Sequence, residues 1–228
     1  LTIRQAFLLT VLSWIAITVF GSLPFVFAEL DMSYTDAFFE AMSGVTTTGS
    51  TVIVALDKAP PGILLWRALL QWLGGVGIIV MAVAVLPMLQ VGGMQIFRME
   101  SSDRSEKVLP RAAQIASGIG TVYLTLTMIC ALFYWFYGMT GFEAVTHAMT
   151  TIATGGFSTS DQSLGHFNSA AIDWTAVIFM IVGSLPFVLY LQAVRGHPGE
   201  LVRDAQVKTF LVITIVLVTL VTCGYWAT

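Results

Sequence analysis

The chain has 228 residues, of which 57% are hydrophobic and only 10% are charged, and its mean hydropathy is +0.85. Soluble domains carry roughly 25% charged residues, so this composition excludes a water-soluble globular domain. Phe, Trp and Tyr make up 12% of the residues, which also excludes intrinsic disorder. The composition therefore predicts an all-α, polytopic membrane protein with the lipid bilayer as its surroundings.

Five apolar stretches are long enough to cross the hydrocarbon layer, which takes roughly 20 residues of helix. They are residues 6–28, 62–89, 113–137, 172–194 and 207–226. Prolines 24, 87 and 186 fall inside three of them and are expected to kink or end those helices. We therefore expect five transmembrane helices, with irregularities at the prolines.

Lysine and arginine are unevenly divided between the two sides of this arrangement. Only Lys58 and Arg67 fall on one side, and the other side carries Arg4, Arg98, Arg104, Lys107, Arg111, Arg195, Arg203 and Lys208. The positive-inside bias makes the basic side cytoplasmic. The segments between spans one and two and between spans three and four are then expected to face outward.

These two outward segments repeat each other at an ungapped offset of 107 residues, with residues 33–51 aligned on residues 140–158. Each opens with a helix-start signature, Ser33-x-x-Asp36 and Thr140-x-x-Glu143. About eleven helical residues would follow, which make a half-membrane helix of roughly 16 Å. The pattern predicts tandem, parallel repeats in which a pore helix and a re-entrant loop stand between two membrane helices.

The residues after each half-helix have the composition of a cation filter. The candidate ligands are Thr46, Thr47, Thr48, Gly49 and Ser50, and Ala153, Thr154, Gly155, Gly156 and Phe157. Extended backbone at membrane depth needs a wet cavity or a protein surrounding, and a dehydrated cation can satisfy its carbonyls. Successive carbonyls can face one axis if positive φ angles alternate with ordinary ones, which predicts positive φ at Gly49 and Gly156. One such segment alone is more often a plain loop, and its recurrence favours the filter.

Arg67 lies in the outer part of the second span, where it either snorkels to the interface or pairs with an outer acid such as Asp57. Gly74, Gly75 and Gly77 indicate a close helix contact, because no strand precedes them as a nucleotide site would require. The spans hold no polar catalytic cluster, so neither an enzyme nor an organic cofactor is expected. The alternative transporter, an alternating-access Na+-coupled symporter, would favour inverted repeats.

Several motifs in this order resemble the Trk/Ktr/HKT superfamily of potassium and sodium transporters, in particular the membrane subunits of bacterial Trk systems. The motifs are Gly21-Ser22-Leu23-Pro24-Phe25, Phe38-Phe39-Glu40-Ala41-Met42-Ser43-Gly44 before Thr46-Thr47-Thr48-Gly49, Gln71-Trp72-Leu73-Gly74-Gly75-Val76-Gly77, Phe97-Arg98-Met99-Glu100, Pro110-Arg111 and Thr154-Gly155-Gly156-Phe157-Ser158. The resemblance implies K+ translocation across the cell inner membrane, with filter loops facing the periplasm. It also implies four M1-pore-M2 units around one pore, a homodimer and a cytoplasmic nucleotide-binding regulatory subunit, and no nucleic acid.

On this basis residues 1–92 are expected to form the first M1-pore-M2 unit and residues 113–195 the second. Residues 93–112 would be a cytoplasmic linker, and residues 196–228 a linker with the first helix of a third, incomplete unit. Continuing the 107-residue offset places a third pore segment near position 247, beyond residue 228. We therefore expect a fragment whose gating residues lie in later units, with self-assembly of two chains as the less favoured alternative.

Overall fold

The computed structural model describes residues 3–28, 30–89 and 108–226, and every regular element among them is a helix. Most of the predicted linker, including the Phe97–Glu100 motif, lies outside the described residues. The chain forms two compact units, Leu1–Ser184 and Leu185–Thr228.

The first half of the larger unit contains four helices and a short 3-10 turn. They are α1 (Ile3–Gly21), α2 (Leu23–Phe27), α3 (Tyr34–Val45), η1 (Leu56–Lys58) and α4 (Pro61–Leu89). The predicted first span is thus interrupted at Ser22, and Pro24 lies in the first turn of α2. Proline suits a helix start because its missing N–H would have no helical partner there.

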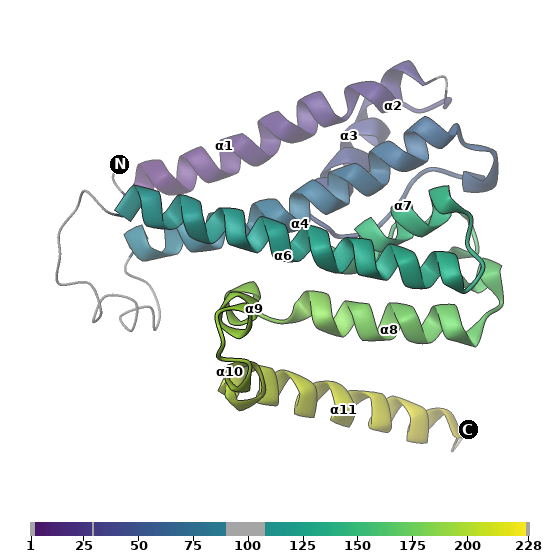
Figure 1. Ribbon diagram of the computed structural model, residues 1–228. Coiled ribbons are helices and arrows are strands. Elements are labelled where there is room, and N and C mark those ends of the chain that lie inside the picture. Colours follow the sequence, from purple (N-terminus) through teal and green to yellow (C-terminus); the bar gives the residue numbers. More distant parts are fainter. Residues whose placement is uncertain (1–2, 29, 90–107, 227–228) are drawn as a thin grey trace. The chain divides into compact units, whose positions relative to one another are not determined.

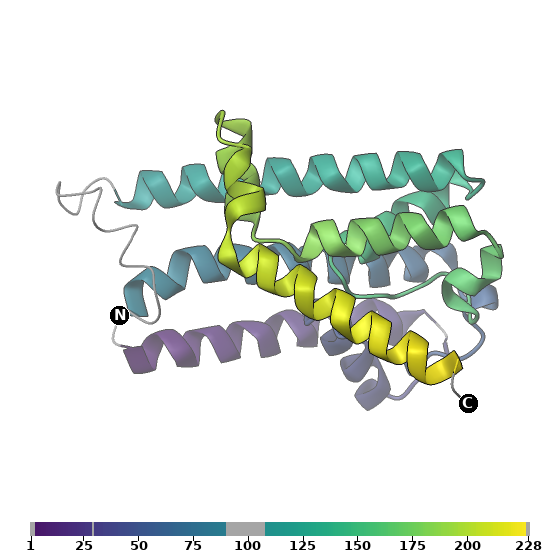
Figure 2. The same cartoon turned by 90° about the horizontal axis from the view of Figure 1, so that it is seen from below.

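The second half of this unit has the same order of long and short elements. Its elements are α6 (Val108–Phe136), α7 (Gly141–Ile152), η3 (Ser163–Phe167) and α8 (Ala170–Ser184). Figure 1 shows α1 and α6 beginning at the same end of the unit, while α4 and α8 run back toward that end. The short helices α3 and α7 lie at the opposite end, as the turned view in Figure 2 also shows.

Helix α4 occupies the central place in this packing, because it contacts α3 of its own half and both α6 and α7 of the other half. Small residues on one face of α3, at Ala37, Ala41 and Gly44, allow the close approach. A methyl group at Gly44 would lie only 2.9 Å from the Cβ of Leu70 on α4. The two short helices are thereby held against one shared support.

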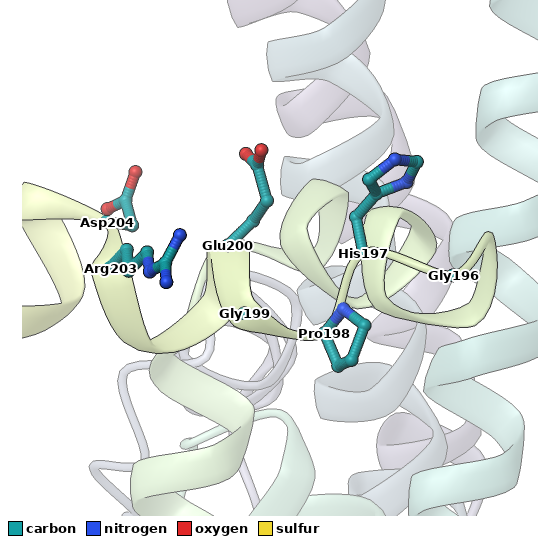
Figure 3. Close-up of a pocket in the computed structure, with 7 residues that line it drawn as sticks. All are labelled: Gly196, His197, Pro198, Gly199, Glu200, Arg203 and Asp204. Carbon is teal, nitrogen blue, oxygen red and sulfur yellow. The ribbon is translucent and has the colours of Figure 1, made fainter.

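The smaller unit contains α9 (Phe187–Val194), α10 (Gly199–Arg203) and α11 (Ala205–Trp226). The predicted span 172–194 is therefore not one continuous helix, since α8 ends at Ser184 and Pro186 is the N-cap residue of α9. Proline ends the helix because it has no N–H to donate and its ring clashes with the preceding turn. Figure 3 shows a hollow of about 430 Å³ beside α10, lined by polar and glycine residues between Gly196 and Asp204.

Within the described residues, three stretches are long and apolar enough to cross a membrane: Phe7–Phe27, Gln114–Phe136 and Ala205–Tyr225. Helices α8 and α9 add a fourth if they are counted together as one broken span. The chain therefore has the helices of a membrane protein, and the count of five spans stays a prediction.

Candidate functional site

The two short helices start with the same hydrogen-bonded cap. The Ser33 hydroxyl accepts a hydrogen bond from the Asp36 N–H at 3.2 Å, and the Thr140 hydroxyl accepts one from the Glu143 N–H at 3.3 Å. Each acid accepts a hydrogen bond from the N–H of its cap residue in return, which completes a capping box. Burial opposes the ionisation of Glu143, but the hydrogen bonds from Thr140 outweigh it and lower the pKa of this carboxyl. Both predicted helix starts are confirmed.

The two short helices also end alike. The Thr48 N–H donates to the Ser43 carbonyl at 2.9 Å, and 107 residues later the Gly155 N–H donates to the Thr150 carbonyl at 2.9 Å. This bond, with the left-handed residue before its donor, is the Schellman type of helix end. The left-handed residues are Thr47 (φ 56°) and Thr154 (φ 53°), where glycine would be usual. A β-branched residue costs about 1–2 kcal/mol in this conformation, so the surroundings must hold it there.

The backbone after each helix end forms two segments, named here the first Thr/Gly segment (residues 46–50) and the second Thr/Gly segment (residues 153–157). Gly49 and Gly156 both have φ 81°, as expected at these two positions. Within the described part of the chain, no hydrogen-bond donor reaches the carbonyl oxygens of residues 47–49 or 154–156. These oxygens are therefore free for a partner from outside the chain.

Ser50 differs from the other members of its segment. Its carbonyl oxygen accepts a hydrogen bond from the Ser43 hydroxyl at 2.6 Å. This bond draws the carbonyl toward α3 and anchors the end of the first Thr/Gly segment. The oxygens without a protein partner thus form a narrower set than the sequence indicated.

The two Thr/Gly segments touch each other at glycines. A Cβ atom at Gly49 would collide with the carbonyl oxygen of Gly155, so only glycine permits this approach. A Cβ atom at Gly156 would meet nothing within 4 Å, so glycine is favoured there by its positive φ alone. Segments that are 107 residues apart in sequence therefore share one contact.

A buried ion pair braces these segments from behind. The Arg67 Nε lies 2.7 Å from Glu40 Oε1, and the two side chains are 1% and 0% exposed. Arg67 therefore neither snorkels to the interface nor pairs with Asp57, and both sequence interpretations were wrong. The reason is that α3 and α4 pack closely enough to bury both charges, where each needs the other to offset its lost hydration.

Each member of the ion pair also holds a backbone segment. Glu40 accepts hydrogen bonds from the Thr51 hydroxyl and the Val52 N–H, both at 2.9 Å, just beyond the first Thr/Gly segment. Arg67 donates to the Ser158 carbonyl at 2.9 Å and lies 4.1 Å from the centre of the Phe157 ring. The ion pair thus fixes the ends of both segments at once.

His147 takes the place of Glu40 in the second half, 107 residues later in the sequence. Its Nε2 lies 3.0 Å from the Ser158 hydroxyl, much as Glu40 accepts a bond from the Thr51 hydroxyl. Its Nδ1 lies 2.9 Å from the Glu143 carbonyl, an oxygen that can only accept. In the neutral ring Nδ1 therefore carries the proton and Nε2 accepts from Ser158. His147 belongs to the support of the second segment.

Two further contacts position the site. Gly74 of α4 and Gly183 of α8 both lie against the last carbonyl of a short helix, at Val45 and Ile152 respectively. The predicted close approach at Gly74 is therefore present, whereas a Cβ atom at Gly77 would meet nothing within 4 Å. Outside the site, Asp161 accepts a hydrogen bond from the Leu56 N–H at 2.9 Å and joins the two outer loops.

Sequence reasoning missed the supporting residues, chiefly Glu40, Gln71 and Ser158. Gln71 is fully buried on α4, and its Oε1 accepts a hydrogen bond from the Phe157 N–H at 3.1 Å. The available signal was a polar residue inside an apolar helix, since such residues are expensive in a membrane and usually have a partner.

Comparison with known proteins agrees with this geometry. The profile of the TrkH family, described as a cation transport protein, matches residues 1–226. The chain belongs to the TrkH family. The potassium uptake protein TrkI of Halomonas elongata is 46% identical over 94% of this chain and 44% of its own length. TrkH of Escherichia coli K12 is 43% identical over 98% of this chain and 47% of its own length.

A solved structure supports the same family assignment. The crystal structure of the potassium transporter TrkH from Vibrio parahaemolyticus matches with a TM-score of 0.84 and 42% identity. The match covers 95% of this chain and 44% of that chain. The chain thus spans somewhat under half the length of the TrkH-family relatives it matches.

Proposed function

We propose that this chain contributes two of the carbonyl-lined quarters of a filter that passes K+ across the cell inner membrane. The supporting observation is the matched pair of Thr/Gly segments, which touch at Gly49 and Gly155 and leave the carbonyls of residues 47–49 and 154–156 without a protein donor. Such oxygens replace the water around a cation, and no bond is made or broken in the passage.

The proposed architecture consists of two parallel M1-pore-M2 units, residues 1–92 and 113–195. The common direction of α1 and α6 in Figure 1 supports this division. The short helices α3 and α7 would direct their negative C-terminal ends toward the ion, which favours a cation. Two segments make only half of a four-sided ring, so we propose that two further segments complete it.

The choice of K+ rests on the relatives, which are named as potassium uptake proteins. The protein would lie in the bilayer with both Thr/Gly segments open to the periplasm. A homodimer and a cytoplasmic nucleotide-binding regulatory subunit are further proposals, which fit the naming of these relatives as parts of a Trk system.

Gly156→Ala tests the filter, because a methyl group there meets open space and changes only the backbone preference. The protein as its cell makes it is expressed in bacteria without other K+ uptake, and K+ and Na+ uptake are measured. We expect the preference for K+ over Na+ to fall about tenfold, since a cost of about 1–2 kcal/mol at positive φ displaces the carbonyl.

Gly165→Ala is the control, because its position is equally open and its φ is not positive. It should leave uptake and preference unchanged. An unchanged K+ preference in Gly156→Ala, with normal amounts of protein in the membrane, would contradict the proposed filter.

A further inference from the structure

Gln71 of α4 lies where the two Thr/Gly segments meet, and its side chain is fully buried. A methyl group at Gly155 would lie 2.5 Å from Gln71 Oε1 and 2.6 Å from Nε2. A methyl group at Gly49 would lie 3.6 Å from the same Nε2. The amide of Gln71 therefore packs against both glycines, one from each segment.

Hydrogen bonding fixes the orientation of this amide. The Phe157 N–H donates to Oε1, so a reversed amide would set the NH2 group against another donor. Nε2 consequently turns away from Phe157, and within the described part of the chain it has no hydrogen-bond partner. Buried polar atoms without a partner are uncommon and destabilising. The position keeps an amide in spite of this cost.

The second half of the unit shows that the fold itself does not require an amide here. Gly74 and Gly183 make equivalent contacts with the last carbonyls of α3 and α7, and each is preceded three residues earlier by Gln71 and Met180 respectively. Met180 has no polar donor and is 42% exposed. The buried amide is therefore particular to the first half, where it reaches the second Thr/Gly segment.

We propose that Gln71 is a positioning residue that sets the spacing of the two segments and thereby the discrimination between K+ and Na+. This inference rests on the proposed filter. Oε1 fixes the second segment directly after Gly156, while the same amide packs beside Gly49 of the first. The number and placement of carbonyl oxygens around a cation determine which ion they favour, so a shift of one segment changes selectivity.

Gln71→Met tests this role with a side chain of similar volume, the residue that the chain itself has at position 180. In the uptake assay above, we expect the preference for K+ over Na+ to fall at least fivefold while the amount of membrane protein is unchanged. Leu73→Met is the matched control, because Leu73 lies on the same helix and is 52% exposed. A parental preference in Gln71→Met would overturn the proposal.

Gln71→Glu separates positioning from packing, because it keeps an oxygen for the Phe157 N–H and loses only the nitrogen without a partner. It should retain the parental preference within about threefold, whereas a loss as large as that of Gln71→Met would overturn the positioning role. If Gly156→Ala changes the preference and Gln71→Met does not, only the role of Gln71 fails. If neither changes it, the proposed filter fails as well.

Discussion

Glu40 and Arg67 place two full charges among apolar helices, and their hydrogen bonds explain how the structure tolerates them. Each charge has the other as partner at 2.7 Å, and each also bonds to backbone groups beside the Thr/Gly segments. Burying an ion costs several kcal/mol, which a single contact barely offsets and a network of hydrogen bonds offsets better. The pair is therefore better explained as a means of fixing backbone than as a source of net stability.

Arg67→Met should destabilise the protein by about 3–5 kcal/mol, because it leaves the Glu40 carboxylate buried without its partner. The double variant Glu40→Gln/Arg67→Met should recover at least half of this loss, since neither buried charge remains. The thermal unfolding midpoint of the purified protein in detergent measures both effects. Lys58→Met, at an exposed position, is the control, and a double variant less stable than Arg67→Met would contradict this account.

At the scale of the elements, the short helices α3 and α7 are defined by local signals at both ends. Their caps at Ser33 and Thr140 and their left-handed ends at Thr47 and Thr154 match one another. Local hydrogen bonds stop each helix after 12 residues, well short of a full membrane crossing. The longer helices α4 and α8 then pack on them through glycines.

Gly74→Ala should be destabilising, because the added methyl group would collide with the carbonyl of Val45 at the end of α3. Overpacking of this kind costs about 1–3 kcal/mol, which exceeds the gain of up to about 1 kcal/mol from alanine in a helix. Gly77→Ala on the same helix meets nothing within 4 Å and should be neutral or slightly stabilising. Unfolding midpoints of the two variants measure the difference, and equal midpoints would exclude a tight contact at Gly74.

At the scale of the whole molecule, the proposed function depends on which side of the membrane each loop faces. The uneven distribution of lysine and arginine places the loop around Val54 outside and the region around Val202 in the cytoplasm. Both side chains are well exposed, Val54 at 88% and Val202 at 70%. They can therefore report on orientation.

In a Cys223→Ser background, which removes the exposed native cysteine, Val54→Cys should react with a membrane-impermeant maleimide in intact cells. Val202→Cys should react only after the inner membrane is opened, because the reagent cannot otherwise reach the cytoplasm. Labelling of both variants is measured on the purified protein. The reverse pattern would invert the proposed orientation.

The sequence by itself determined what depends on near neighbours along the chain. The capping boxes at Ser33 and Thr140, the breaks at Pro24 and Pro186 and the positive φ at Gly49 and Gly156 are local events. Each follows from one residue type and its position within a turn. The ungapped 107-residue offset made these signals readable twice.

Only the tertiary structure decided which distant residues meet. Helical periodicity shows which face of α4 carries Arg67 and Gln71, but not that this face lies against α3 and α7 together. Glu40 thus became the partner of Arg67 where Asp57 had been considered, and the contact between Gly49 and Gly155 could not be foreseen. The physical reason is that such contacts depend on the packing of helices joined by loops of different lengths, which local sequence does not encode.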